Sequence, residues 1–367
     1  MINGKVFNLE GMVTEGSGEA GQFMTLDWVK DQCQNSVNFE PFPGTLNLKV
    51  KAADFDFIRR IASARGKRII PPASESGFCE ARLLYAEVRG ISAALLYPMV
   101  DDYYTDILEI IAPVKVKPEL GLQNGDRLGF SIYLPDQLNR PGGIIFDLDG
   151  TLIDSVDLFY SMLCEGFQEV GIPLSPRDQV MKFMGSGARL SEAWQALELD
   201  FDQARKEELF ARLVGVFETL WESRYEQEVR LFTGVEKFLQ SLISSGIVLG
   251  VVTSSFYKGK MDLFARSNLD PQVYFSSIVT GPDTANSKPH PEPVQLCLKQ
   301  MGMNPGSVFL VGDSPCDIDA GSQAGLFTVG VLSGAGTRSS LSAAGADLIV
   351  DGVVDLAEHI LLEPEGL

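Results

Sequence analysis

Four short segments in the second half of the chain combine carboxylates, hydroxyls and one lysine. In chain order they are "DLDGT" (147–151), "VVTSS" (251–255), "SKPHPEP" (287–293) and "VGDSPCDID" (311–319). Each follows or neighbours an apolar run that predicts a buried strand, and open α/β sheets place their sites beyond the carboxyl ends of such strands. We therefore expect the four segments to meet in one site.

These segments carry the groups needed to transfer phosphate to a carboxylate. At a strand end, Asp147 can be a nucleophile that forms an aspartyl-phosphate. Two residues on, Asp149 can give a proton to the leaving group and later take one from water, and Gly150 permits the tight bend between them. Thr253 can donate hydrogen bonds to phosphoryl oxygens. Lys288 supplies a fixed positive charge, without which Asp147 would resist a dianion.

Asp313 and Asp317 add hard oxygen ligands of the kind that Mg²⁺ prefers. Each group also has a plainer explanation. A lone "DLDG" is often a turn, a strand-end threonine or an aspartate before a helix is often a cap, and a lysine before proline is often a solvated loop charge. Because the four pieces occur together and in order, they favour a metal-dependent phosphoryl-transfer site.

With these motifs, residues from about 142 to 360 resemble the haloacid dehalogenase superfamily of phosphohydrolases, in its phosphoglycolate phosphatase-like branch. The resemblance covers about 60% of the chain and implies a helical cap after the first motif. It implies Asp147 as nucleophile, Asp149 as general acid and base, Thr253, Ser254 and Lys288 as phosphoryl-binding residues, and Asp147, Asp149 (through its backbone carbonyl), Asp313 and Asp317 (through water or from behind the direct ligands) at Mg²⁺.

Other reactions of that superfamily fit these residues less well. The carboxylate of Asp149 argues against dehalogenation, which needs neither that acid nor a metal. Phosphonate cleavage requires a Schiff-base lysine in the cap, where Lys182 is the only lysine near the loop. A phosphomutase stays open, although the cap shows no clear group to hold a second phosphate and the two histidines are His290 and His359. Arg189 could bind a substrate anion from the cap or be a surface residue.

The pattern of apolar residues changes once along the chain and predicts two domains. The first part alternates apolar and polar residues between turn signals, with one helix near 53–64, which predicts a small β-barrel. After the linker 135–143, buried strands alternate with helices, which indicates a Rossmannoid α/β domain with a parallel sheet. A helical block over about 156–230 predicts an inserted cap. The expected domains are residues 1–136 and 137–367.

A second candidate site lies in "PFPGTLNLKV" (41–50) of the first domain. The period of two in a strand places Leu46 and Leu48 on one face, and Thr45 and Asn47 on the other. Neutral oxygens two residues apart suit Mg²⁺ if nucleotide phosphates complete its ligand shell. A polar face that merely meets solvent is the alternative.

Two more segments accompany that strand: the glycine-rich loop "GMVTEGSGEAGQF" (11–23), and "DILEIIAP" (106–113), which puts Glu109 inside an apolar run. Together the three segments resemble the archaeal-type CTP-dependent riboflavin kinases, whose fold is a six-stranded cradle-loop barrel, over nearly all of residues 4–134. The resemblance implies CTP as phosphate donor and riboflavin as acceptor, giving FMN. It implies Gly16 and Gly18 near the nucleotide, Thr45 and Asn47 on Mg²⁺, and Glu109 at the ribityl hydroxyl that is phosphorylated.

One stretch departs from that family. Where the family usually carries an arginine and a histidine, this chain has Asp101 and Asp102, and two acids there weaken contact with an anionic nucleotide. The basic run 59–68 could compensate, or could be the solvated face of a helix. The first domain is therefore expected to be an active kinase or a binding module without turnover.

Composition limits the partners. The net charge is −19, and by our count residues 139–367 hold 16 basic against 31 acidic residues. Because this half repels a phosphate backbone, we expect small phosphorylated metabolites and no nucleic acid as ligands. No apolar run approaches the ~18–20 residues of a membrane span, and five scattered cysteines fit reduced thiols. We expect a cytoplasmic protein.

The fusion itself suggests a substrate for the phosphatase. An active kinase beside a phosphatase that preferred FMN would run a futile cycle. The expected substrate is therefore the ribitylamino-pyrimidine 5′-phosphate that precedes riboflavin. Phosphoglycolate or a sugar phosphate, with a first domain that binds flavin or nucleotide without catalysis, is the alternative.

Overall fold

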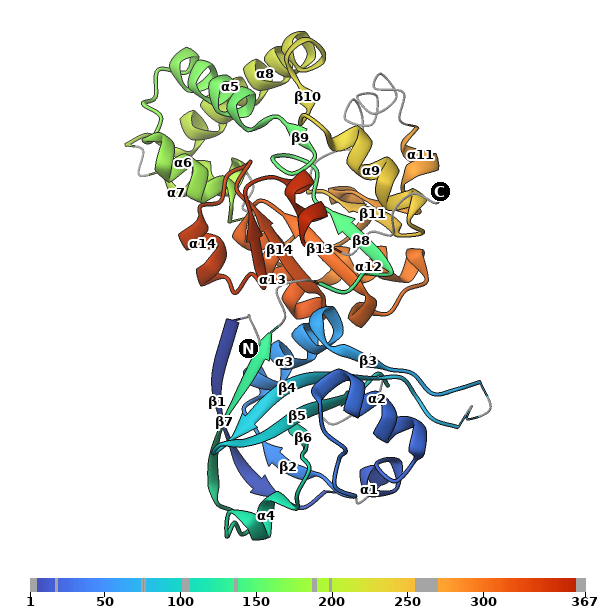
Figure 1. Ribbon diagram of the computed structural model, residues 1–367. Helices are drawn as coiled ribbons and strands as arrows, with labels where there is room; N and C mark the ends of the chain where they lie inside the picture. Colours follow the sequence, from blue (N-terminus) through green and yellow to red (C-terminus); the bar gives the residue numbers. More distant parts are fainter. Residues whose placement is uncertain are drawn as a thin grey trace. The chain divides into compact units, whose positions relative to one another are not determined.

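The computed structural model describes most of the chain, as two compact units (Figure 1). The described residues are 5–16, 19–73, 75, 77–100, 106–134, 138–186, 190–197, 200–254 and 270–360. The first unit runs through Arg140 and includes His359 and Ile360, and the second runs from Pro141 to Glu358. Among the described helices, none is long and apolar enough to cross a membrane.

The first unit is built from antiparallel strands in the order β3-β4-β5-β6-β2-β1-β7. Because β7 also pairs with β4, the series of pairings that starts at β4 returns to it. The strands are β1 (Lys5–Thr14), β2 (Leu46–Lys49), β3 (Lys67–Ile69), β4 (Ala81–Val88), β5 (Ile91–Pro98), β6 (Ile107–Ile111) and β7 (Arg127–Leu134). The helices are α1 (Glu19–Phe23), α2 (Asp27–Val37), α3 (Ala52–Arg65) and α4 (Val116–Glu119).

Strand β2 follows the predicted alternation on one face only. Leu46 and Leu48 are buried as the period of two predicts, and Lys49 is exposed. Asn47, however, is only 5% exposed. A face that merely meets solvent therefore does not describe β2, since one of its polar side chains is enclosed.

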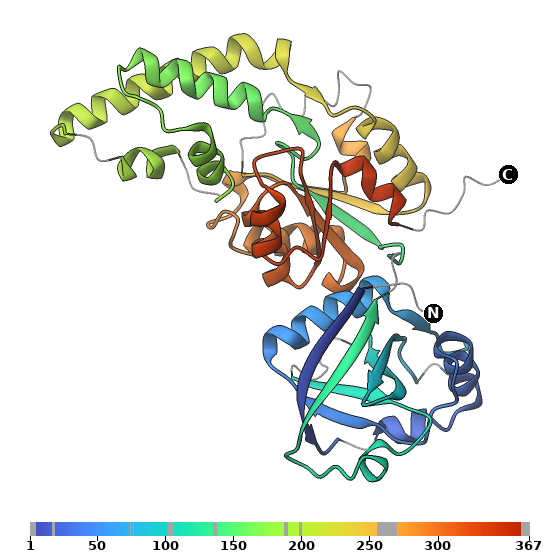
Figure 2. The ribbon, with the colours of Figure 1, turned by 60° about the vertical axis from the view of Figure 1, so that its left-hand side comes forward.

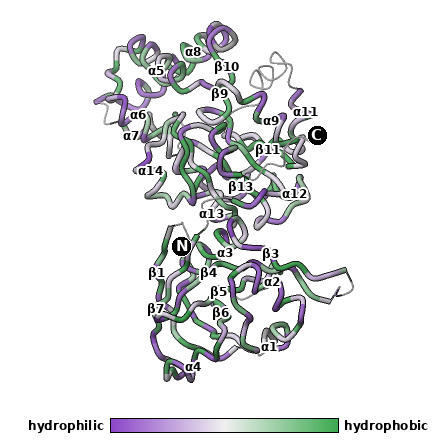
Figure 3. Tube along the Cα trace, viewed as in Figure 1, coloured by the Kyte–Doolittle hydropathy of each residue, from purple (hydrophilic) through white to green (hydrophobic). Residues whose placement is uncertain are grey.

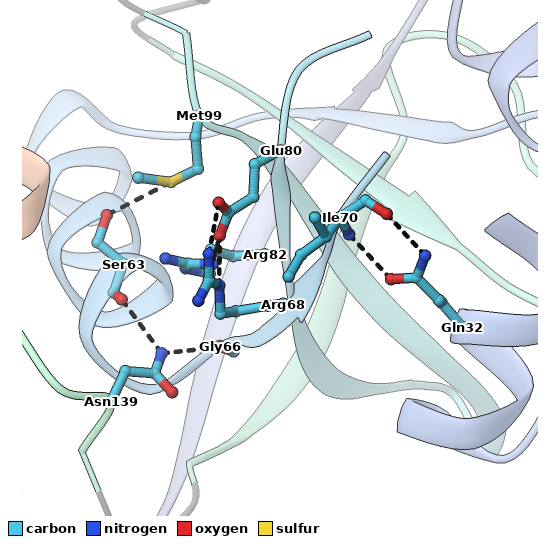
Figure 4. Close-up of polar contacts among 9 residues, drawn as sticks. All are labelled: Gln32, Ser63, Gly66, Arg68, Ile70, Glu80, Arg82, Met99 and Asn139. Atoms are coloured by element: carbon cyan, nitrogen blue, oxygen red, sulfur yellow. Dashed lines mark hydrogen bonds and ion pairs between the residues drawn. The ribbon is translucent and has the colours of Figure 1, made fainter. Parts of the chain in front are cut away.

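Helix α3, predicted near 53–64, is capped at its C-terminus by Asn139, which lies beyond the end of β7 in the chain. The Asn139 side chain donates to the carbonyls of Ser63, at 3.3 Å, and Gly66, at 2.9 Å (Figure 4). Carbonyls at a helix end have no partner within the helix, so these bonds satisfy them. The Leu138 backbone N–H also donates to the carbonyl of His359, at 2.8 Å.

The second unit is a six-stranded parallel sheet in the order β12-β11-β8-β13-β14-β15. Its strands read as apolar runs because helices cover them, and Figure 3 colours them mostly hydrophobic. They are β8 (Gly143–Phe146), β11 (Val248–Val252), β12 (Ser277–Val279), β13 (Val308–Gly312), β14 (Phe327–Val331) and β15 (Leu348–Val350). The helices are α9 (Val235–Ser244), α11 (Pro271–Tyr274), α12 (Glu292–Met301), α13 (Pro315–Ala324) and α14 (Arg338–Ala343), with short 3₁₀ turns at Gly281–Asp283, Pro305–Ser307 and Val353–Glu358.

A helical layer leaves this sheet between β8 and β11, on the residues of the predicted cap (Figure 2). The chain enters it through β9 (Ile153–Asp154) and returns through β10 (Arg230–Leu231), which pair antiparallel. Its helices are α5 (Val156–Glu169), α6 (Arg177–Met184), α7 (Leu190–Ala196) and α8 (Gln203–Glu228). Buried side chains such as Leu163, Trp194 and Leu213 give the layer a hydrophobic core of its own.

Candidate active site

Three predicted site residues each stand directly after a strand of the parallel sheet. Asp147 follows β8, Thr253 follows β11 and Asp313 follows β13, and all three are buried. The order of the strands reverses at β8, which has β11 on one side and β13 on the other. Because parallel neighbours end at the same edge, the fold brings the three side chains to one point, at the position where open sheets bind ligands.

Lys288, from the loop before α12, reaches into the middle of this cluster. Its ammonium donates to Asp147 Oδ1 and to Asp317 Oδ1, both at 2.6 Å, and to the carbonyl of Val252 at 3.1 Å. The side chain is only 4% exposed. A charge taken out of water needs partners of opposite sign, and here two carboxylates supply them.

Both carboxylate oxygens of Asp317 accept hydrogen bonds. While its Oδ1 accepts from Lys288, its Oδ2 accepts from the backbone N–H and the hydroxyl of Ser314, in a capping box at the start of α13. One carboxylate oxygen from each of Asp147, Asp313 and Asp317 lies within 4.8 Å of the other two. Since both Asp317 oxygens already have donors, its arrangement suits positioning of Lys288 better than direct contact with a cation.

The carboxylates are crowded enough to disfavour their charged forms. Burial, with smaller contributions from Asp317 and Asp149, raises the pKa of Asp147 to about 7, although Lys288 opposes the shift. Burial and then the charge of Asp147 raise the pKa of Asp313 well above its usual range. Such a set of hard oxygens with more negative than positive charge fits a divalent cation such as Mg²⁺.

Asp149 stands in the turn that follows β8. Gly150 has a φ of +78°, in the left-handed region that glycine favours, and its N–H donates to the carbonyl of Ile153 at 2.8 Å. The hydroxyl of Ser155 donates to Asp149 Oδ1 at 2.7 Å. The bend thus directs Asp147 and Asp149 to one site, as the sequence predicted for Gly150.

Residues 333–336 also belong to the site and were missed from the sequence. The Ala335 N–H donates to Asp313 Oδ2 at 2.6 Å, and the Ser333 hydroxyl donates to the carbonyl of Gly150 at 2.7 Å. A Cβ on Gly334 would lie 2.0 Å from Asp313 Oδ2. The signal was present, because "SGAG" follows the apolar run of β14. Ser155 was missed as well.

A cavity of about 240 Å³ opens over these groups, and Thr253 and Ser254 are among the residues that line it. The other residues weighed from the sequence do not join it. Lys182 is exposed and does not line the cavity. His290 does not line it either, and its Nδ1 accepts from the backbone N–H of Glu292. Arg189 lies outside the described residues.

Described residues of the second candidate site, in the first unit, also lie close to one another. Asn47 and Glu109 are directly paired across β2 and β6, so their side chains share a face, and each is 5% exposed. The Asn47 amide donates to the Thr45 hydroxyl at 3.3 Å. A Cβ on Gly16 would lie 2.3 Å from Asn47 Nδ2, so the glycine-rich loop lies against this face. Gly18 is outside the described residues.

Lys117, which the sequence did not single out, fixes the start of the glycine-rich loop. Its ammonium donates to the carbonyl of Thr14 at 2.8 Å and to Asn124 Oδ1 at 2.9 Å. A cavity of about 200 Å³ lies beside β2, lined by Thr45 and Lys115 among others. Thr45 is the residue that this cavity shares with the polar face, whereas Asn47, Glu109 and the described residues of the glycine-rich loop do not line it.

The basic run 59–68 is partly neutralised within the first unit. Arg68 makes two hydrogen bonds to the carboxylate of Glu80, at 2.8 and 3.0 Å, and Arg82 pairs with the same carboxylate (Figure 4). Arg68 is therefore not simply a solvated cation. Asp101 and Asp102 lie outside the described residues.

Comparison with known proteins matches both units. The family model described as haloacid dehalogenase-like hydrolase matches residues 144–331, and the CTP-dependent riboflavin kinase model, described as a domain of unknown function (DUF120), matches residues 13–132.

A phosphoglycolate phosphatase of Salmonella choleraesuis is 30% identical over 241 residues, which is 60% of this chain and 93% of that protein. The Escherichia coli K12 phosphoglycolate phosphatase is also 30% identical, over 229 residues, covering 58% and 90%. A crystal structure from Haemophilus somnus, described as a "predicted phosphoglycolate phosphatase", has 25% identity and a TM-score of 0.51 over 59% of this chain and 96% of its own.

We predict that Mg²⁺ stabilises the second unit through its buried carboxylates. At a hundred times its Kd, a ligand adds ~2.7 kcal/mol to the free energy of unfolding, which corresponds to a rise in Tm of a few degrees. Calorimetry with Mg²⁺ against EDTA measures the shift. Asp313→Asn should remove most of it, whereas Asp319→Asn, on helix α13 just after Asp313 in the chain but outside the cavity, should keep it. An equal shift in Asp313→Asn would contradict the assignment.

Proposed function

The chain belongs to the haloacid dehalogenase-like hydrolases, and from that membership we propose that its second unit is a Mg²⁺-dependent phosphomonoester hydrolase acting through an aspartyl-phosphate on Asp147. The observation that carries the proposal is the buried cluster of Asp147, Lys288 and Asp313 at the edge of the sheet. A strand-end carboxylate held by an ammonium is oriented for attack, and the ammonium offsets the charge of an incoming phosphate dianion.

In the proposed reaction, an Asp147 oxygen attacks phosphorus while Lys288 holds the carboxylate in place. The bond between phosphorus and the substrate oxygen breaks, and Asp149, oriented by Ser155, gives its proton to that oxygen. Asp149 then takes a proton from water, whose oxygen attacks the phosphorus of the aspartyl-phosphate. Inorganic phosphate leaves, and the Asp147 carboxylate is restored.

The remaining residues bind phosphate and metal in this proposal. Thr253, Ser254 and Lys288 contact the phosphoryl oxygens. Asp147, Asp313 and the backbone carbonyl of Asp149 hold Mg²⁺, and Asp317 acts through Lys288. When bound, the metal neutralises charge on the transferring phosphoryl group. Hydrolysis is favoured over phosphomutase chemistry because the described cap residues that line the cavity carry no charge with which to hold a second phosphate.

The first unit contains a domain of the CTP-dependent riboflavin kinase family, and we propose that it converts riboflavin to FMN on a cradle-loop barrel. Thr45 and Asn47 would hold Mg²⁺ with the nucleotide, which Gly16 and Gly18 approach, and Glu109 would take the proton of the ribityl hydroxyl. Support comes from the buried Asn47–Glu109 pair and from the β4–β7 pairing that returns the strands to β4.

The proposed substrate of the phosphatase is the ribitylamino-pyrimidine 5′-phosphate upstream of riboflavin. Hydrolysis of this compound leads toward riboflavin, the substrate of the kinase, whereas hydrolysis of FMN would reverse the kinase reaction. Values of kcat/KM for that compound, FMN and phosphoglycolate, measured with the full chain, test the proposal. We expect the pyrimidine phosphate to lead by at least about tenfold, and a preference for phosphoglycolate would overturn it.

Asp147→Asn should abolish hydrolysis and leave the kinase intact. Loss of the nucleophile is expected to lower kcat by at least about a thousandfold, while FMN formation from riboflavin and Mg-CTP stays within twofold. Phosphate release, and FMN separated from riboflavin by chromatography, measure the two activities in one preparation. Asp319→Asn is the matched control. If Asp147→Asn also removed FMN formation, the two sites could not be independent.

Gly16→Ala should weaken binding of Mg-CTP by about tenfold or more. The added Cβ would overlap the Asn47 amide, and close approach of backbone is what glycine permits in such a loop. Gly129→Ala on β7 is the control, since its Cβ would meet only the carbonyl oxygen of Leu9, at 3.9 Å. Titration calorimetry with Mg-CTP gives both affinities, and equal values for the two variants would argue against a nucleotide at Gly16.

A further inference from the structure

The cavity over Asp147 has two unlike walls. Its floor on the sheet side carries carboxylates, hydroxyls and the ammonium of Lys288. Its opposite wall, from helices α5 to α8 of the cap, is apolar. Lining side chains of that wall are Phe159, Leu163, Phe183, Met184, Leu190 and Trp221. The floor is the proposed phosphoryl site, so the apolar wall faces the rest of the substrate.

Ring packing within the cap fixes the aromatic part of this wall. Phe159 meets Phe217 with centroids 4.9 Å apart at 65°, and Phe217 lies against Trp221 at 6.2 Å and 24°. Phe217 in turn packs on the core of the cap. Phe159 and Trp221 remain only partly buried. Rigid aromatic surface left accessible inside a cavity is a surface for an apolar ligand group.

The charges of the described lining residues disfavour a second anionic group on the substrate. Among the described lining residues, Lys288 is the one cation, and Asp147 and Asp317 already hold it. The described cap residues that line the cavity carry no charge. Among these described residues, a carboxylate that followed the phosphate would meet either apolar side chains or the acidic floor, and both are unfavourable.

We propose that the cap wall selects phosphate monoesters of alcohols that carry a flat, uncharged ring, which lies against Trp221 and Phe159. The inference rests on the proposed phosphatase function and specifies its substrate class. Aromatic rings gain from offset or edge contacts with other rings beyond the burial of their area. A small acid such as glycolate has no ring that could pack against the cap wall.

A panel of simple primary esters tests this selectivity with the full chain and Mg²⁺. Benzyl phosphate presents a flat ring, cyclohexylmethyl phosphate an apolar ring that is not flat, and phosphoglycolate a carboxylate. We expect kcat/KM for benzyl phosphate to exceed that for phosphoglycolate at least tenfold and that for cyclohexylmethyl phosphate at least threefold. Equal values for benzyl phosphate and phosphoglycolate would overturn the proposal.

Variants of the wall locate the effect. Trp221→Ala should lower kcat/KM for benzyl phosphate about tenfold, mainly through KM, and change that for phosphoglycolate less than twofold. Trp221→Phe, which keeps a ring, should retain most of the preference. Phe201→Ala is the control, because Phe201 lies just before α8 but is 47% exposed and does not line the cavity. If each of Trp221→Ala and Trp221→Phe lowered kcat/KM equally for benzyl phosphate and phosphoglycolate, a role of Trp221 in substrate selection would be contradicted.

The outcomes separate this inference from the function on which it rests. Acetyl phosphate, which has neither ring nor carboxylate, reports the phosphoryl chemistry alone. If neither acetyl phosphate nor any ester of the panel is hydrolysed with Mg²⁺, the proposed phosphatase function fails. If acetyl phosphate is hydrolysed and the ring brings no advantage, only the selectivity of the cap wall is refuted.

Discussion

The second unit depends on one buried ammonium. Lys288 lies 2.6 Å from an oxygen of Asp147 and of Asp317 and is almost wholly enclosed. Taking an ion out of water costs several kcal/mol, and removing one partner of such a group leaves an uncompensated charge that costs about 3–5 kcal/mol. The end of β8, the loop before α12 and the start of α13 are therefore coupled, since each supplies one of the three charges.

The ammonium of Lys288 does not compensate all the carboxylates around it. Lys288 is shared by Asp147 and Asp317, whereas Asp313 receives the N–H of Ala335 and is enclosed by the backbone of Gly334. Burial beside Asp147 raises the pKa of Asp313, so a cation there would favour the ionised form that can coordinate it. In the proposed reaction, a cation bound there would reduce the repulsion that a phosphate dianion meets.

Local pattern predicted the groups that directly follow apolar runs. Asp147, Thr253 and Asp313 could be placed because parallel strands end at one edge of a sheet. Contacts between distant parts of the chain could not be predicted this way. Asn47 lies against the loop at Gly16, and the N–H of Ala335 reaches Asp313 from a glycine-rich turn. The β4–β7 pairing likewise joins strands that no local period relates.

The two proposed phosphoryl-transfer sites differ in charge, and the reactions proposed for them differ accordingly. The second unit places carboxylates around a single ammonium, as suits a site where a carboxylate itself attacks phosphorus. The first unit pairs one carboxylate, Glu109, with the neutral side chains of Asn47 and Thr45. A nucleotide brings its own negative charge and its own Mg²⁺, so neutral oxygens can complete that metal's shell without adding repulsion. A hydroxyl acceptor then needs one base, which is the role of the enclosed Glu109 in the proposed kinase reaction.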